Sequence, residues 1–292
     1  MNPCPADVTL QLDVLQAAVL GITQGISEFL PISSSGHLIA VPWAADWRDV
    51  YCAKEGNKFF DVALHMGTFV GAALYLRRDL GALIKAWFRS VARRGVAGPQ
   101  ERLAWFLVLS AIPGALVGAV FGGVLTDHFG HPWQIAGFLA IFGVVLWAAD
   151  RYAGQATGYE DLRASQVVAM SVAQAAALMP GVSRSGVTIT AARLMGVSRD
   201  AAARFSFLMS LPIILGAGAY SALSLGDGAG LAGQELQFVV GIVASGISGA
   251  LAVFGVLSFL RRHTLGAFMW YRLAAAAFMV LLIVSGTRPA TI

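Results

Sequence analysis

The sequence predicts an all-α polytopic membrane protein, with a single integral membrane domain over residues 1–292. Hydrophobic residues make up 57% of the chain and charged residues only 12%, and the mean hydropathy is +0.71. A soluble domain carries about twice that charged fraction, ~25%. The composition therefore argues against a disordered chain, a nucleic-acid-binding protein, a disulfide scaffold and a water-soluble enzyme.

The chain contains two kinds of apolar stretch, some broken by a proline and some unbroken. Residues 8–45 are broken at Pro31 and residues 165–195 at Pro180, so their pieces are too short to cross a bilayer alone. Polar backbone at such a break needs cover from protein or a water-filled cavity, and we predict two re-entrant helical hairpins. Six unbroken stretches predict full transmembrane helices, over residues 59–76, 103–126, 133–149, 201–225, 237–260 and 265–285.

Lysine and arginine indicate the orientation, because cytoplasmic loops carry an excess of both. Residues 77–102 are rich in them and should be cytoplasmic, with 81–94 as a basic amphipathic helix on the membrane surface. The loop 226–236 contains Asp227 and Glu235 but no basic residue, and should lie outside. This path puts both chain ends outside, the first hairpin entering from outside and the second from inside.

The two ends of the predicted path resemble each other in sequence. Residues 1–126 and 165–285 become inverted repeats, joined by a connecting transmembrane helix and loop over 127–164. Ser33-Ser34-Ser35-Gly36 matches Ser183-Arg184-Ser185-Gly186 at an offset of 150, and Gln24 matches Gln174 at the same offset. Inverted repeats with broken helices place a binding site near the midplane, where we expect the hairpin tips to meet.

The cysteines and the N-terminus carry less information. Cys4 and Cys52 are too few for a disulfide framework or a metal cluster. No basic residue precedes Arg48, so the chain lacks the positive region of a cleavable signal peptide, and we expect Met1 to begin the mature chain.

The two hairpin tips carry the residues that could bind or react with a substrate. Ionisable groups are costly in lipid and normally pair or line a functional cavity, which singles out Glu28, His37 and Arg184. Each tip begins a Ser- and Gly-rich helix, whose free N–H groups favour an anion. We therefore predict a phosphate site with four catalytic candidates, Glu28, Ser34, His37 and Arg184. The candidates for substrate binding are Gln24, Ser33, Ser35, Ser183, Ser185 and Thr188.

Each of these signals also has an ordinary structural explanation. Serines at helix starts are usually caps, and a Glu–Arg pair in a membrane is often a structural ion pair. Asp61 and His65 share one face of the first full span; they could line the site or bridge helices, and we favour a role in supporting the site from behind. Arg193 and Arg204 are interpreted as snorkelling cations near the inner surface, and Arg272 as the partner of a carboxylate. The duplicated Ser-Xaa-Ser-Gly turns favour a functional site.

Two long segments resemble a known family. QGISEFLPISSSGHL (24–38) and PGVSRSGVTITAARLMGVSRDAAARFSFLMSLP (180–212) are similar to the signatures of the bacterial undecaprenyl-diphosphate phosphatases, also called bacitracin-resistance proteins. FDVALHMG (60–67) and WYRL (270–273) also resemble that family, so the similarity covers nearly the whole chain. The resemblance implies hydrolysis of undecaprenyl diphosphate to undecaprenyl phosphate and inorganic phosphate. Such an enzyme recycles the lipid carrier for peptidoglycan synthesis and confers bacitracin resistance.

The same resemblance implies roles for individual residues. It matches the family's glutamate to Glu28, its candidate serine nucleophile to Ser34, its histidine to His37 and its arginine to Arg184. It implies a divalent metal, magnesium or calcium, with Glu28 as a ligand. Some members have glutamate where this chain has Gln24, which still offers an oxygen ligand or a hydrogen bond to phosphate.

The expected setting is the bacterial inner membrane, with the site facing the periplasm or exterior and the polyprenyl tail lying in the bilayer. Ser34 would attack the terminal phosphorus, activated by His37 or Glu28, or one of these two would activate water directly. The alternatives are a transporter or flippase for a phosphate-headed polyprenyl lipid, and a lipid-binding scaffold without turnover. Whether two copies form a homodimer stays open.

Overall fold

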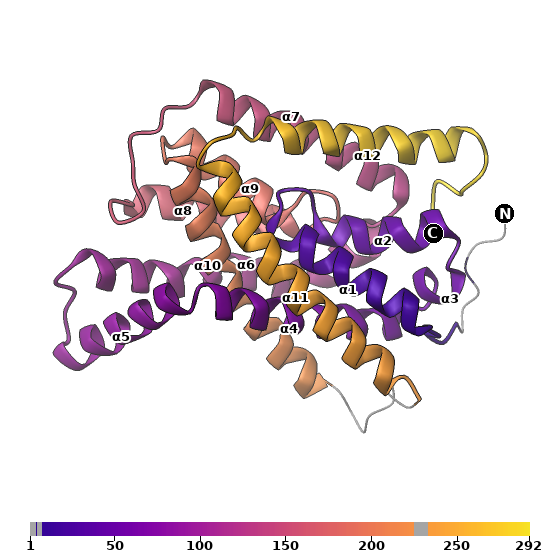
Figure 1. Cartoon of the computed structure of the whole chain (residues 1–292), viewed down its shortest axis with the longest axis horizontal. Helices are drawn as coiled ribbons and strands as arrows, with labels where there is room; N and C mark the ends of the chain where they lie inside the picture. Colours follow the sequence, from indigo (N-terminus) through magenta and orange to yellow (C-terminus); the bar gives the residue numbers. More distant parts are fainter. Residues whose placement is uncertain (1–3, 5–7, 225–232) are drawn as a thin grey trace.

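The computed structural model describes residue 4, residues 8–224 and residues 233–292. Within these ranges the chain is helical, and the one β-type contact is an isolated bridge between Thr157 and Val197. Part of the acidic loop 226–236, including Asp227, lies outside the described residues. Figure 1 shows the arrangement of the helices, which are α1 Val14–Phe29, α2 Ser34–Ala45, α3 Arg48–Tyr51, α4 Lys54–Tyr75, α5 Arg77–Arg93, α6 Pro99–His128, α7 Pro132–Tyr152, α8 Ala164–Ala175, η1 Ala176–Leu178, α9 Arg184–Leu194, α10 Arg199–Ser224, α11 Glu235–Leu260 and α12 Gly266–Val284.

Five of these helices are long and apolar enough to cross a membrane: α6, α7, α10, α11 and α12. They cover five of the six predicted spans, so the chain is a polytopic helical membrane protein. The sixth predicted span, 59–76, falls in α4, which meets the same criterion only together with α5. The two helices are bent by 85° at Leu76, so the basic helix turns away from the span that precedes it.

The two proline-broken stretches each form a pair of short helices. α1 and α2 have 16 and 12 residues and are separated by a first turn, residues 30–33. α8 and α9 have 12 and 11 residues and are separated by η1 and a second turn, residues 179–183. None of the four reaches the ~20 residues that a full span requires. Each broken stretch therefore consists of helices too short to cross a bilayer alone, as the sequence predicts.

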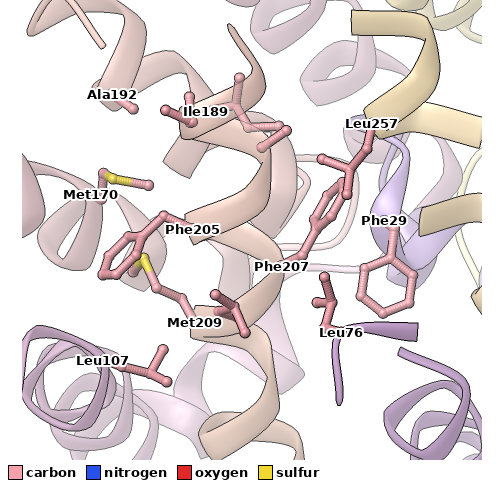
Figure 2. Packing of buried hydrophobic residues seen from close by; sticks show 14 of the residues in the cluster. Phe29, Leu76, Leu107, Met170, Ile189, Ala192, Phe205, Phe207, Met209 and Leu257 are labelled. Carbon is pink, nitrogen blue, oxygen red and sulfur yellow. The ribbon is translucent and has the colours of Figure 1, made fainter. Parts of the chain in front are cut away.

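The largest hydrophobic cluster surrounds α10 and supports the end of α1. Figure 2 shows Phe205 on the side of Met170, and Phe207 on the side of Phe29 and Leu257. The rings of Phe29 and Phe207 meet edge to face, with centroids 5.3 Å apart. Because Phe29 directly follows Glu28, this contact fixes the carboxylate near the middle of the bundle.

Small residues bring α1 and α4 close to α11. A side chain at Gly25 would collide with the α11 backbone at Ser245, and one at Gly67 would collide with the carbonyl of Ile242. Close approach of this kind is typical of membrane helix packing, where small residues let backbones touch. Both glycines lie within a turn of a site residue, Glu28 on α1 and His65 on α4. α11 thus sets the spacing of the two helices that carry these residues.

The two cysteines form a disulfide that the sequence analysis did not expect. It joins Cys4 to Cys52 across 48 residues, with the Cα atoms 5.3 Å apart. The C-terminal segment packs nearby, where Trp43 donates from Nε1 to the carbonyl of Pro289 at 3.0 Å. In Figure 1, α3 and the C-terminus lie at the opposite end of the molecule from α5.

The prediction that Arg193 and Arg204 snorkel is wrong. Arg193 has 0% exposure, and its Nε donates to Asp150 Oδ1 at 2.9 Å. Arg204 pairs with Asp79, the acidic residue in the first turn of α5. Both arginines therefore tie helices together instead of reaching out to headgroups.

Candidate active site

The two turns touch each other near the centre of the bundle. The backbone N–H of Gly181 in the second turn donates to Ser33 Oγ at 3.0 Å, across 148 residues of sequence. In the other direction, Ser185 Oγ donates to the carbonyl of Leu30 at 3.0 Å. A side chain at Gly36 would press on the backbone of Gly181 at 3.1 Å, so glycine favours this close approach. The two turns therefore meet, as the sequence leads us to expect.

Ser33 and Ser183 adopt the same unusual backbone conformation. Both have φ of 78°, where non-glycine residues are rare, and both are the N-cap of the helix that follows. Their hydroxyls accept from the N–H groups of Gly36 and Gly186 respectively. Strained backbone of this kind concentrates at functional sites. The strain directs two helix N-termini, with their N–H groups, toward the same region.

Glu28 is the centre of the polar cluster. Its Oε1 accepts from Arg184 Nη2 at 2.9 Å, and its Oε2 accepts from Ser34 Oγ at 2.6 Å. Gln24, one helical turn earlier, donates from Nε2 to Oε2 at 3.0 Å. One carboxylate thus joins the first residue of α2 to the first residue of α9, although 150 residues separate them.

His65 also reaches Glu28, so it lines the site directly instead of taking the supporting role that the sequence favoured. Its Nε2 lies 3.5 Å from Glu28 Oε2, while its Nδ1 donates to the carbonyl of Asp61 at 2.7 Å. The helical spacing of Asp61 and His65 indicated a shared face but not the rotation of α4 that brings His65 forward. His65 belongs to the cluster and Asp61 supports it from behind.

Arg184 is fixed from two sides. Its Nη2 binds Glu28, and its Nη1 donates to the carbonyl of Ser206 on α10 at 3.2 Å. Thr188, one turn further along α9, shares a hydrogen bond of 2.7 Å with the hydroxyl of Ser206. Thr188 is fully buried, so it holds α9 against α10 beneath the guanidinium.

His37 contacts α12 and not Ser34. Its Nδ1 is 2.7 Å from the carbonyl of Ser33, which can only accept, so Nδ1 carries a proton. Its Nε2 is 2.8 Å from the hydroxyl of Tyr271, and the two rings stack. The nitrogen that could act as a base is therefore occupied by Tyr271, and the carboxylate of Glu28 is the base within reach of Ser34.

The other predicted binding serines differ in accessibility. Ser33, Ser183 and Ser185 are buried and engaged with the turns. Ser35 is partly exposed, and its hydroxyl oxygen lies 3.5 Å from the hydroxyl oxygen of Ser33. The structure therefore leaves Ser34 and Ser35, at the start of α2, as the accessible hydroxyls of the set.

Arg272 has a different role from the one the sequence predicted. The prediction of a carboxylate partner is wrong, since none of the ion pairs among the described residues involves Arg272. The guanidinium instead donates to five backbone carbonyls. These belong to Leu139, Phe138, Pro31, Gly181 and Val182. No sequence pattern points to such partners, because every residue has a carbonyl.

A divalent cation can be tested against the donor atoms around Glu28. Within the described ranges, no group of three or more His, Cys, Asp or Glu side chains could hold a metal. Gln24 Oε1, however, is buried without a hydrogen-bond partner beside the Glu28 carboxylate. Because Nε2 must face the carboxylate, the amide cannot flip to satisfy that oxygen. Two hard oxygen donors fit magnesium or calcium, provided that phosphate oxygens and water complete the coordination.

Comparison with known proteins agrees with the motifs and the geometry. Residues 17–278 match the model of the family described as bacitracin resistance protein BacA. The chain is 41% identical to an undecaprenyl-diphosphatase of Pelobacter propionicus over 94% of its own length and 99% of that protein. It is also 41% identical to proteins of that name from Desulforudis audaxviator, covering 89% of this chain and 94% of the relative, and Thermomicrobium roseum, covering 95% and 100%. By this match along nearly its whole length, the chain belongs to the bacitracin resistance protein BacA family.

Proposed function

We propose that this protein is a membrane phosphatase that hydrolyses undecaprenyl diphosphate to undecaprenyl phosphate and inorganic phosphate. The observation that carries the proposal is the Glu28 carboxylate, which binds the hydroxyl of Ser34 and the guanidinium of Arg184 at once. A carboxylate on a hydroxyl is the arrangement of an activated nucleophile, and an arginine suits a phosphate. The names of the relatives support the same substrate.

The proposed reaction begins at Ser34. Its oxygen attacks the terminal phosphorus while the proton passes to Glu28, and the bond from that phosphorus to the bridging oxygen breaks. Undecaprenyl phosphate leaves with the bridging oxygen and its electron pair. Water then attacks the phosphoserine, inorganic phosphate departs, and Ser34 regains a proton. Bacitracin resistance and recycling of the lipid carrier for peptidoglycan synthesis follow from this activity.

The remaining groups bind and orient the diphosphate. Arg184 and the N-terminal N–H groups of α2, with the Ser35 hydroxyl, hold the terminal phosphate. Glu28 and Gln24 Oε1 would hold magnesium or calcium, which would neutralise negative charge on the diphosphate oxygens. Ser33, Ser183, Ser185 and Thr188 act by fixing the turns that carry the other groups. Such positioning, together with charge stabilisation, accounts for most catalysis in phosphoryl transfer.

The membrane arrangement is part of the proposal. We infer that α1–α2 and α8–α9 are re-entrant hairpins beside six full spans, and that residues 1–126 and 165–285 are inverted repeats joined by 127–164. The disulfide of Cys4 with Cys52 supports an oxidising compartment at the start of α4. The basic helix α5 follows the other end of α4, about 33 Å away at 1.5 Å per residue. Together these features support a bacterial inner-membrane protein whose site opens to the periplasm.

Phosphate release by the purified protein in detergent tests the function. The wild-type protein should release inorganic phosphate from undecaprenyl diphosphate, and Ser34→Ala should abolish release, whereas Ser285→Ala at the end of α12 should behave as wild type. Acid quenching during turnover should trap phosphate on Ser34. Turnover without any phosphoserine would favour direct attack by water. Absence of turnover from a folded wild-type protein would favour the transporter or scaffold alternative.

The oligomeric state is a separate part of the proposal. We propose a homodimer, since the long apolar helix α6 leaves most of its surface uncovered within one chain. Light scattering in detergent measures the mass directly, and a monomer mass at all protein concentrations would contradict it.

A further inference from the structure

Arg272 is a fully buried cation that the proposed reaction does not use. Its exposure is 0%, and it lies in α12, one of the helices able to cross a membrane. A buried charge without a counter-ion is costly, so a protein that keeps one has to surround it with aligned dipoles. Here the surrounding dipoles are carbonyls, and their positions in the fold show what the charge holds together.

The five carbonyls belong to three separate segments. Nη1 donates to Pro31 in the first turn at 3.1 Å. Nη2 donates to Gly181 and Val182 in the second turn at 2.8 and 3.2 Å. Nε and Nη2 also donate to carbonyls of α7, the helix beside α12 in Figure 1. One planar guanidinium therefore bridges both turns and anchors them to α7.

The Arg272 bridge controls the distance from Arg184 to Ser34 and Glu28, on which the proposed catalysis depends. Glu28 and Ser34 lie on either side of the first turn, whereas Arg184 directly follows the second turn. A shift of one turn against the other moves Arg184 relative to the nucleophile and its base. Misplacement by about 1 Å can lower a rate by about 100-fold, even when every reacting group is present.

We propose that Arg272 is a positioning residue that sets the placement of the second turn against the first, and so aligns Arg184 with Ser34 and Glu28. The inference rests on the proposed phosphatase function. A lysine at this position keeps the charge but has a single nitrogen, so it cannot reach three segments at once. Geometry, and not charge alone, is therefore the property to test.

The first experiment compares two buried arginines. Arg272→Lys should lower kcat about 100-fold while KM changes much less, because substrate is still bound but no longer aligned. Arg193→Lys is the matched control, since Arg193 also has 0% exposure and also binds carbonyls, those of Gly154 and Val197. Melting temperatures are measured for both. If Arg193→Lys melts lower but keeps kcat below its melting temperature, the loss at position 272 is specific to alignment.

A second pair of variants reaches the same bridge without removing the arginine. A methyl group at Gly143 on α7 would meet Cβ of Arg272 at 3.2 Å, closer than most side-chain contacts, so Arg272 or α7 has to shift by a few tenths of an ångström. At Gly137 on the same helix, an added methyl group meets nothing within 4 Å. Gly143→Ala should therefore lower kcat, and Gly137→Ala should not. This pair decides the matter even if Arg272→Lys fails to fold.

The activities of the wild-type protein and of the variants distinguish failure of the phosphatase function from failure of the positioning role. If wild-type protein releases no phosphate, the proposed function fails and takes this inference with it. If wild-type protein is active but Arg272→Lys keeps wild-type kcat, or Gly143→Ala equals Gly137→Ala, only the positioning role is overturned. A kcat loss in Arg272→Lys that merely follows the unfolded fraction would likewise overturn it.

Discussion

Ser34 donates a hydrogen bond of 2.6 Å to Glu28 Oε2 across the first turn, although the two residues lie on different helices. The same carboxylate oxygen accepts from Gln24 and lies 3.5 Å from His65 Nε2. Ser34 therefore faces a base that is already oriented by its neighbours. The sequence offered His37 as an equally good base, but the unprotonated Nε2 of its ring is hydrogen-bonded to the hydroxyl of Tyr271.

Glu28→Gln should abolish most turnover. The amide cannot take the Ser34 proton, and general base catalysis contributes about 10²- to 10⁴-fold. The variant also leaves Arg184 without its counter-ion, so the melting temperature should fall. Steady-state kinetics and thermal melting measure the two effects. Glu235→Gln, at the exposed start of α11, is the control and should match wild type. A Glu28→Gln enzyme within tenfold of wild type would exclude Glu28 as the base.

Arg184→Lys should lose about 10- to 100-fold in kcat/KM although the charge is kept. Arg184 donates from Nη2 to Glu28 and from Nη1 to the carbonyl of Ser206, and the remaining N–H donors of the same fixed plane can serve a phosphate. A lysine ammonium cannot keep both contacts. The control is Arg89→Lys on the exposed face of α5. Near-normal turnover of Arg184→Lys would make this arginine structural.

Metal dependence should respond to Gln24. Chelation should stop phosphate release, and magnesium or calcium should restore it. Gln24→Glu adds a second carboxylate beside Glu28, so half-maximal activity should need less metal, and Gln24→Leu should need more. Gln174→Leu is the matched control, because Gln174 Oε1 is also buried without a partner but lies on α8 against α6. Full activity after exhaustive chelation would contradict the metal proposal.

Tyr271→Phe should lower stability by about 1 kcal/mol, the typical contribution of one hydrogen bond, and should leave kcat close to wild type because the proposed reaction does not use His37. The phenyl ring keeps the stacking on His37 but frees its Nε2, so the imidazole loses one of its two anchors. Tyr152→Phe, which alters an 80% exposed tyrosine, should have no effect. Equal melting temperatures for the two variants would show that the hydrogen bond from Tyr271 to His37 adds no stability, and a tenfold loss of kcat in Tyr271→Phe would give His37 a part in the reaction.

Thiol labelling should establish the orientation. In a background with both native cysteines replaced by serine, Asp49→Cys should react with an impermeant reagent in intact spheroplasts. Gly95→Cys should react only after lysis, because it follows the basic helix α5. Both positions are exposed, so accessibility to the reagent depends on the side of the membrane. The opposite pattern would overturn the outward-facing site.

The sequence was sufficient for the features that depend on hydrophobicity and on proline. Long apolar stretches became long helices, and the breaks at Pro31 and Pro180 became turns. The Ser-Xaa-Ser-Gly repetition at an offset of 150 correctly indicated two equivalent turns, since Ser33 and Ser183 share their φ of 78°. Helix lengths, proline breaks and turn conformations depend on neighbouring residues in the chain, so a single sequence is enough to predict them.

Other contacts depend on the rotation and packing of whole helices. His65 reaches Glu28 because small residues bring α1 and α4 against α11, and helical spacing alone does not give that rotation. Arg272 was expected beside a carboxylate because charges usually pair, yet its partners are carbonyls, which carry no sequence signal. The Cys4–Cys52 bond likewise depends on how the N-terminal segment runs in three dimensions.

The Cys4–Cys52 bond converts residues 4–52 into a covalent ring. Gln24, Glu28, Ser34 and His37 all lie inside this ring, whereas Arg184 lies outside it. In the proposed orientation the bond closes once both cysteines have reached the oxidising side of the membrane, which would make completion of the ring a maturation step after membrane insertion. A cell that inserts this protein without thiol oxidation makes the same polypeptide with an open ring, in which the ends of the segment that carries α1 and α2 are no longer tethered.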